Sequence, residues 1–435
     1  MARAGGEWRN WAGDQACRPA AVERPGSAAE VAEAIERART AGRGVRAAGS
    51  GHSFTDAALT GGTLISLDRM RRILEVDRAS GLARIEAGIS LRECSEALEA
   101  HGLAFENLGD IDVQSIAGAT ATGTHGTGAA LRNLSAGLRE IELVTPAGET
   151  LSLSESSDPD AWRAARVSVG ALGVVTAVTL QAVPAFTLEG TDTTEPLEAV
   201  LDTVDERAQA VDHFEFYVFP HSALALTRTN RRVDGPPRPH GAVRAWADDV
   251  LLRNHVFGLA VAAGRYAPRL IPSINRALAR ASGTSVRVDR SYRIFASPRR
   301  VRFTEMEYAL PREHAAEAVR RVLAVAERAD LAVPFPIEVR FVAGDDALLS
   351  SAGGRDTCYI AVHMYRGMAW EEYFRAIERA LDGYGGRPHW GKRHFQTAST
   401  LAPRYPEWER FQAVRERLDP DGTMANDYVR RTLVG

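Results

Sequence analysis

Two glycine-rich turns that carry histidines are the segments of this chain best suited to chemistry. Gly49-Ser50-Gly51-His52-Ser53 follows a β-branched run, and Gly123-Thr124-His125-Gly126 comes later. Glycines let a backbone approach a ligand closely, and the free N–H groups of such turns suit a pyrophosphate. The pattern indicates an enzyme that binds a dinucleotide, with His52 placed to bond to it covalently.

Neither of the common nucleotide patterns fits the first turn. A Rossmann fingerprint needs G-x-G-x-x-G between a strand and a helix, but here Gly49-Ser50-Gly51 lacks both the third glycine and the helix. A NAD-type βαβ unit and a P-loop are therefore excluded. An ordinary glycine turn with a surface histidine remains the alternative.

The second glycine region, residues 107–128, is rich in small and hydroxylated side chains. Such a backbone could run alongside a flat ligand. A flexible linker would look similar, although linkers rarely include residues such as Ile111, Val113 and Ile116.

A charged pair stands out in the second half of the chain. In the run 336–342, Ile337, Val339 and Phe341 share one face of a strand, which leaves Glu338 and Arg340 on the other, about 7 Å apart by strand rise. The pair could hold substrate hydroxyls, or it could be a surface ion pair of little energetic value.

Two further segments could take part in catalysis. His363 and Tyr365 share a face of the strand-like run 359–365, and His363 could act as a general base, or simply be a satisfied polar residue. The loop 387–395, with Lys392, concentrates cationic and aromatic groups. It could hold an anion or a ring edge, or be solvated.

The elements that would position these residues form two patterns. Capping boxes at Ser27 and Ser90 begin helices that end at Gly42 and Gly102. Strand-like runs at 63–67, 73–77, 82–87, 140–145 and 173–180 make the first 185 or so residues α/β or α+β.

After Pro184 the pattern changes to alternating strands at 213–219, 304–310, 337–342 and 358–365, with helices near 312–329 and 370–381. This predicts a second domain formed by an antiparallel sheet with helices on one face. Residues 231–241 are expected to form a surface loop. Residues 245–281 mix apolar and basic residues at helical spacing, so they either pack on the protein or contact a membrane surface or a partner.

Composition limits the class of protein. The chain has 435 residues, is 45% hydrophobic and carries a net charge of −3, which predicts two or three domains and excludes nucleic acid as the main partner. Three cysteines without CxxC spacing suggest neither a disulfide framework nor a zinc site, and so no metal. Without a signal sequence or a transmembrane segment, a soluble cytoplasmic protein is expected.

Several ordered motifs together resemble the aldonolactone and alditol oxidases of the vanillyl-alcohol oxidase flavoprotein superfamily. The resemblance covers nearly the whole chain. The motifs are Gly49–Ser53, Ala121–Gly126, Gly170–Val175, Glu338-Val339-Arg340, His389-Trp390-Gly391-Lys392 and Asn426–Arg431.

The resemblance implies an α+β fold with a two-subdomain FAD-binding domain at residues 1–184, a substrate (cap) domain at 185–395 and a C-terminal tail at 396–435 that returns to the first domain. It implies FAD joined covalently to His52 through the flavin 8α-methyl group. The residues expected to line the FAD are Ala47, Ala48, Gly49, Ser50, Gly51, His52, Ser53, Gly109, Ser115, Gly118, Thr122, Gly123, Thr124, His125, Gly173 and Val175.

The same resemblance assigns the catalytic groups. Glu338 and Arg340 would grip the oxygens of a polyol or lactone, Lys392 would stabilise negative charge near flavin N1, and His363 would assist proton removal. Asp110 stands where alditol oxidases have a serine, and Tyr365 where they have a threonine. The run 106–112 resembles the lactone branch instead, which favours a 1,4-lactone oxidised at the hydroxyl next to the carbonyl.

Gly109 bears on the electron acceptor. In related flavoenzymes a small residue beside flavin C4a opens a path for oxygen, so oxidase activity that yields hydrogen peroxide is expected. Three alternatives stay open: an alditol oxidase, a dehydrogenase that uses another acceptor, and a non-enzymatic flavin- or carbohydrate-binding protein.

Overall fold

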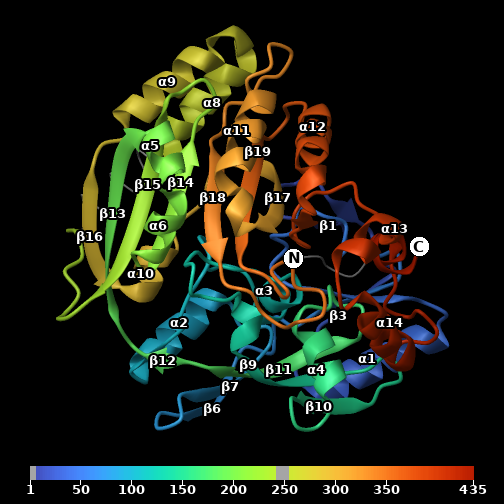
Figure 1. Cartoon of the computed structure of the whole chain (residues 1–435). Helices are drawn as coiled ribbons and strands as arrows, with labels where there is room; N and C mark the ends of the chain where they lie inside the picture. Colours follow the sequence, from blue (N-terminus) through green and yellow to red (C-terminus); the bar gives the residue numbers. More distant parts are fainter. Residues whose placement is uncertain (1–5, 242–253) are drawn as a thin grey trace.

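The computed structural model describes residues 6–241 and 254–435, and the chain forms two sheet-based halves (Figure 1). In the first half, β3 (Ala21–Glu23), β5 (Thr63–Ser66) and β4 (Val45–Ala48) pair in parallel, with β5 in the centre. Helix α1 (Ala28–Thr40) packs apolar residues, including Val31 and Ile35, against this sheet. The Ser27 side chain caps this helix by accepting a hydrogen bond from the backbone N–H of Glu30, but the predicted capping box is incomplete, because the Glu30 carboxylate accepts from Gly26 instead of Ser27.

A second sheet completes this half. Its strands are all antiparallel, in the order β10 (Thr150–Ser154), β9 (Leu138–Val144), β11 (Val174–Gln181), β7 (Leu82–Glu86) and β6 (Ile73–Asp77). Helices α2 (Leu91–Ala100), α3 (Ile116–Ala121) and α4 (Pro159–Arg166) accompany it. The predicted capping box at Ser90 is confirmed, and so is the α+β class. Short antiparallel pairs join β1 (Trp8–Arg9) to β2 (Ala16–Cys17) and β8 (Leu103–Ala104) to β12 (Val183–Pro184).

The second half is one antiparallel sheet, as the alternating runs predict. Its order is β16 (Ser285–Arg290), β13 (Thr187–Pro196), β15 (Leu224–Val233), β14 (His213–Val218), β18 (Ile337–Val342), β19 (Thr357–Tyr365), β17 (Phe303–Pro311) and β20 (Arg387–Pro388).

One face of this sheet is apolar, and it packs against α5 (Leu197–Asp202), α6 (Val204–Gln209), α11 (Ala315–Ala326) and α12 (Glu371–Leu381). Phe214 and Phe216 of β14 and Val339 of β18 belong to that core. Because side chains alternate along a strand, the residues between them face the other way, toward the first half of the chain.

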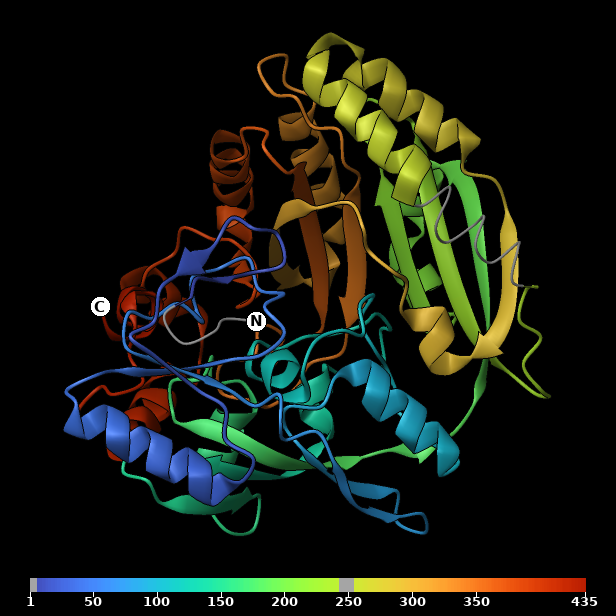
Figure 2. The ribbon, with the colours of Figure 1, turned by 180° about the vertical axis from the view of Figure 1, so that it is seen from behind.

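Helices also lie on the other side of the sheet, beyond what the sequence predicts. Figure 2 shows α8 (Phe257–Tyr266) and α9 (Ile271–Ala281) across one end of the sheet, and α10 (Ser291–Phe295) at the other. The expected amphipathic segment 245–281 thus becomes α8 and α9 in its later part, while residues 245–253 lie outside the described residues. The helix expected at 312–329 is shorter, because a 3-10 turn, Arg312–His314, precedes α11.

The C-terminal segment, with α13 (Ala398–Leu401), α14 (Trp408–Leu418) and α15 (Asp427–Val429), packs against the first half. The Asn426 side-chain amide donates to the carbonyls of Asp56, Ala57 and Leu59. The backbone N–H of Val45 donates to the carbonyl of Thr423, 2.8 Å away. The division at residues 184 and 395 stays a prediction.

Candidate active site

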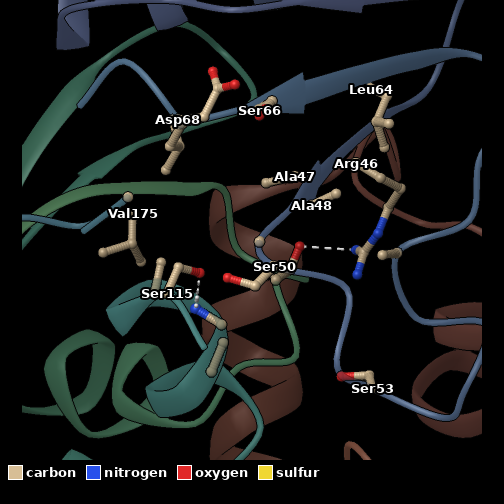
Figure 3. Close-up of a pocket in the computed structure, with 18 of the residues that line it drawn as sticks. Arg46, Ala47, Ala48, Ser50, Ser53, Leu64, Ser66, Asp68, Ser115 and Val175 are labelled. Carbon is tan, nitrogen blue, oxygen red and sulfur yellow. Dashed lines mark hydrogen bonds between the residues drawn. The ribbon is translucent and has the colours of Figure 1, made fainter. Parts of the chain in front are cut away.

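A cavity of about 600 Å³ lies beside the first glycine-rich turn. β4 leads into this turn, and Figure 3 shows Ala47, Ala48, Ser50 and Ser115 around the space. Among the residues predicted to bind the cofactor, those that line it are Ala47, Ala48, Gly49, Ser50, Ser53, Ser115, Gly118, Thr122, Gly173 and Val175.

The wall of this cavity is made largely of small residues and exposed backbone. A Cβ atom added to Gly49 would lie 2.3 Å from the Ser115 hydroxyl oxygen, so only glycine allows the turn to approach the start of α3. That hydroxyl caps α3 by accepting a hydrogen bond from the N–H of Gly118. A groove of backbone groups and small side chains fits the phosphates and sugars of a dinucleotide.

Gly51 and Gly123 do not line this cavity or the one that adjoins it. Both have positive φ angles, +74° and +71°, which residues with a side chain rarely adopt. Their positive φ angles shape the two turns, and their direct contact with the cofactor stays a prediction.

A second cavity, of about 140 Å³, continues from the first, and Ser53 and Thr122 belong to the walls of both. It brings together the two parts of the chain. The predicted residues that line it are His52, Gly109, Asp110, Thr124, His125, Glu338, Arg340, His363 and Lys392. Tyr365, which shares a strand face with His363, is not among the lining residues; it stacks on Phe335 at a centroid distance of 6.5 Å.

His52 stands in the wall of this second cavity with its ring stacked on Trp11, 5.4 Å between centroids. Burial and, to a smaller extent, the positive charge of Lys392 together lower the pKa of His52 to about 4. The imidazole is therefore neutral at physiological pH, with a nitrogen lone pair available for a covalent bond.

The predicted pair on β18 is buried and does not lie on the surface. Glu338 and Arg340 are 6% and 8% exposed, and their side chains contact each other. Asp110 lies 2.7 Å from the Arg340 guanidinium, and Glu215 lies 3.3 Å from it on the neighbouring strand β14. Removing charged groups from water costs free energy, so the groups of this cluster have to be stabilised by one another.

The pKa values of the carboxyl groups in this cluster shift in opposite directions. Burial raises the pKa of Asp110, but the charges of Arg340 and Arg299 outweigh it and leave that pKa below its ordinary value. Burial raises the pKa of Glu338 to about 8, where the attraction of Arg340 is opposed by the charges of Asp110 and Glu215. Asp110 is thus ionised at neutral pH, while Glu338 retains its proton.

His363 is oriented by one hydrogen bond. Its Nδ1 lies 3.2 Å from the carbonyl of Pro336, which can only accept, so Nδ1 carries the proton and Nε2 has the lone pair. Nε2 faces Glu305 at 3.6 Å and Glu338 at 3.9 Å. Burial lowers the pKa of His363, so the ring is neutral and can accept a proton at Nε2.

Lys392 is paired with an acidic residue that the sequence did not point to. Its Nζ lies 2.5 Å from the carboxylate of Glu305 on β17. Two positions along this strand, Glu307 lies 3.3 Å from His125 Nε2, and the charge of His125 outweighs burial and holds the pKa of Glu307 well below its ordinary range. The His125 ring stacks on Tyr359 at 3.7 Å, so it supports the wall of the cavity from behind.

Several residues of this site were missed by the sequence reasoning. They are Tyr217, Arg299, Glu305 and Glu307, all of which line the second cavity together with His389 of the predicted loop 387–395. A signal existed for the two glutamates, because Glu305 and Glu307 alternate with the apolar residues Met306 and Tyr308. Acidic residues at every second position of an otherwise apolar strand indicate that one face of the strand lines a polar site.

A dinucleotide cavity that opens into a polar cavity with a neutral histidine, a buried acid and a buried base defines an FAD-dependent oxidoreductase. Residues 19–154 match the family described as FAD binding domain, and residues 178–432 match that described as D-arabinono-1,4-lactone oxidase. The chain belongs to the D-arabinono-1,4-lactone oxidase family.

Its relatives include both oxidases and a dehydrogenase. The chain is 51% identical to an L-gulono-1,4-lactone dehydrogenase of Mycobacterium tuberculosis over 98% of this chain and 99% of the relative. It is 34% identical to the L-gulonolactone oxidase of Mus musculus (99% and 98%) and 32% identical to an alditol oxidase of Streptomyces (98% and 99%). A solvent-stable cholesterol oxidase shares the fold, with a TM-score of 0.79 over 97% of this chain and 96% of that one at 18% identity.

Proposed function

We propose that this protein oxidises a sugar 1,4-lactone, of the L-gulono- or D-arabinono-lactone type, at the hydroxyl next to the carbonyl. FAD, when bound, supplies the two-electron acceptor for the hydride that leaves the carbon. The observation that carries the proposal is the second cavity, whose wall joins His52 and Lys392 to Glu338 and Arg340. No separate substrate site is needed.

The residues of the chain have distinct parts in this reaction. Arg340 and protonated Glu338 donate hydrogen bonds to lactone oxygens and orient the C–H bond. His363 takes the hydroxyl proton at Nε2, since its Nδ1 is held by Pro336. Lys392, beside Glu305, provides a fixed positive charge where negative charge develops.

Asp110 favours a lactone over a polyol, which is the main competing substrate class. It accepts from Arg340 and from Arg299, 2.5 Å away, and so places a fixed negative charge, already paired with two arginines, in the wall of the second cavity. Anaerobic mixing with L-gulono- or D-arabinono-1,4-lactone should bleach the flavin absorbance, whereas xylitol or sorbitol should not. Bleaching by the polyols alone would establish an alditol oxidase, and bleaching by neither class would refute both.

We propose further that the FAD is bound covalently through His52. The neutral imidazole at the cavity wall supports this assignment. After acid precipitation, the yellow colour should stay in the pellet for the wild-type protein and move to the supernatant for His52→Ala. Colour released from the wild-type protein would refute the attachment.

The electron acceptor is proposed to be oxygen, with hydrogen peroxide as the product. Two electrons and two protons pass from the lactone through the flavin to O2, which balances the reaction. Gly109 supports this choice because it leaves the cavity wall without a side chain at that position. Reoxidation of the reduced protein by oxygen in a stopped-flow instrument should be much faster than that of free flavin. Equal rates would point to a dehydrogenase.

A further inference from the structure

The helical segment formed by α8 and α9 exposes large apolar side chains. Tyr266 is 84% exposed, Leu259 73% and Leu270 53%, and the first two are the most exposed large apolar residues of the described chain. Isolated exposed apolar residues are common on protein surfaces, but a group on one element calls for an explanation. We call Leu259, Tyr266 and Leu270, with the arginines described below, the α8–α9 patch.

The exposed residues follow helical spacing. Leu259, Ala263 and Tyr266 lie three or four positions apart along α8 and are all exposed, and Leu270 is exposed in the short 3-10 turn that follows the end of the helix. The opposite side of the same segment is buried, with Val261, Gly264 and Ile271 packed inward. The segment therefore has apolar residues on two sides. One side packs against the rest of the protein, and the other is exposed.

The charge of this segment is strongly one-sided. Residues 250–288 contain no aspartate or glutamate, although the whole chain has 56 of them. Arg265, Arg269, Arg276 and Arg280 are all exposed on α8, α9 and the turn between them. Within the described residues no carboxylate lies in ion-pair distance of these four, whereas many other arginines of the chain are paired.

We propose that the α8–α9 patch docks the protein on the surface of a bilayer that contains anionic lipid. Guanidinium groups would bind lipid phosphates, while Leu259, Tyr266 and Leu270 would enter the boundary between headgroups and acyl chains. Binding to an anionic bilayer requires positive charge without nearby acidic residues and an exposed apolar surface, and the α8–α9 patch has both.

A second copy of the chain fits the patch less well. A two-fold symmetric contact would bring the arginine-rich segments of both copies into one interface without any carboxylate from residues 250–288, and like charges across an interface oppose association. An acidic protein would satisfy the arginines, and the experiment below distinguishes that case.

The patch is connected to the active site through α8. Phe257, at the start of this helix, lines the second cavity and packs on Phe335 at a centroid distance of 5.0 Å. Figure 2 shows α8 and α9 as the outermost elements at this end of the molecule. Docking through the patch would thus hold the cavity wall close to the bilayer without covering the FAD-binding half.

The test is vesicle flotation of the purified FAD-loaded protein. Vesicles of phosphatidylcholine mixed with phosphatidylglycerol should carry the protein upward, and vesicles of phosphatidylcholine alone should carry much less. Added salt should weaken the binding, since exposed charges are screened. Both Leu259→Glu/Tyr266→Glu and Arg269→Glu/Arg276→Glu should reduce binding to the mixed vesicles by roughly tenfold or more.

Matched controls come from elsewhere on the surface. Leu74→Glu removes a similar apolar side chain on β6 that is 44% exposed, and Arg78→Glu reverses an exposed charge after the same strand. Both should bind like the wild type, and all variants should keep their flavin content and thermal midpoint. No binding to mixed vesicles, or equal loss in patch and control variants, would overturn the proposal. A wild-type dimer that the patch variants convert to a monomer would overturn the proposal in favour of a second copy of the chain. Binding of the patch to an acidic protein, with no binding to the mixed vesicles, would overturn it in favour of a protein partner.

Discussion

The hydroxyl of Tyr217 lies 3.1 Å from the carboxyl group of Glu338, 3.0 Å from that of Glu215 and 3.3 Å from that of Asp110. A tyrosine has one proton to donate, so it cannot satisfy three carboxylates at once. A carboxyl group that carries its own proton can instead donate to the Tyr217 oxygen. Burial raises the pKa of both Glu215 and Glu338, and the value of about 8 for Glu338 leaves that group protonated at neutral pH.

This proton predicts how stability depends on pH. In the unfolded chain Glu338 titrates near its ordinary pKa of 4.5, and in the native protein near 8. Between these values the native state holds a proton that the unfolded state has lost, so the free energy of unfolding falls as the pH rises through this window. Glu338→Gln removes this loss. Its thermal midpoint relative to the wild type should therefore increase from acidic to mildly alkaline pH.

Differential scanning fluorimetry of the substrate-free proteins across that range measures the effect. Glu33→Gln on α1, whose side chain is 68% exposed, serves as the control and should show no such trend. A constant difference between Glu338→Gln and the wild type would contradict a protonated Glu338. The same proton should make kcat/KM for the lactone fall above about pH 8 in the wild type, because ionised Glu338 cannot donate to the substrate.

Arg299 should affect substrate binding more than turnover. It reaches Asp110 from the segment before β17, its side chain is 38% exposed, and it lines the second cavity. Removal leaves Asp110 paired with Arg340, so the clamp persists but loses one charge-assisted donor. Arg299→Ala should raise KM for the lactone by roughly tenfold while kcat changes little.

Steady-state kinetics of Arg299→Ala and of Arg300→Ala separate a specific effect from a general one. Arg300 is exposed next to Arg299, and its backbone N–H donates to the side chain of Asn254. Its removal should leave KM unchanged. Equal effects in the two variants would show that the loop, not the Arg299 charge, is responsible.

Gly109 should control the reaction with oxygen. Gly109 lines the second cavity, and a Cβ atom added here would lie 3.0 Å from the carbonyl oxygen of His125, tighter than ordinary contacts, so the surrounding wall would have to shift. Gly109→Ala should slow reoxidation of the reduced protein by oxygen by roughly tenfold, with the rate of reduction by lactone nearly preserved. Gly137→Ala, where the added atom meets nothing closer than 3.9 Å, should change neither rate. Unchanged reoxidation in Gly109→Ala would show that oxygen takes another path.

Local patterns allowed much of this architecture to be predicted. Capping residues placed α1 and α2, and alternation placed Glu338 and Arg340 on the face of β18 that turns out to face the cavity. These features depend on residues within a few positions of one another, where spacing alone determines direction.

The remainder depends on contacts between distant segments. Glu215 lies beside Arg340, and Glu305 beside His363, only because β14 pairs with β18 and β17 with β19 in a particular register. A one-residue shift would turn each of these side chains to the opposite face, and the sequence of one strand does not specify its partner. Arg299 was missed for a similar reason, because it reaches the site from an irregular segment without a periodic pattern.

Arg46 should be the main structural support of the cofactor cavity. It is 3% exposed, and its guanidinium donates to four backbone carbonyls, those of Ala57, Val169, Gly170 and Met424, at 2.7 to 2.9 Å. These acceptors come from three segments that are distant in sequence, so one side chain joins them around the FAD site. Arg46→Met would leave all four carbonyls without this donor and should lower the free energy of unfolding by roughly 3 kcal/mol or more.

Arg46→Lys distinguishes geometry from charge. A lysine keeps the positive charge, but its donors diverge from a single atom and cannot match the planar fork of the guanidinium. It should therefore recover only a small part of the lost stability in urea unfolding and should retain less FAD than the wild type. Arg39→Met, an exposed change on α1, is the control and should alter neither property. Full recovery in Arg46→Lys would mean that charge alone supports the site, and that the four directed hydrogen bonds contribute little.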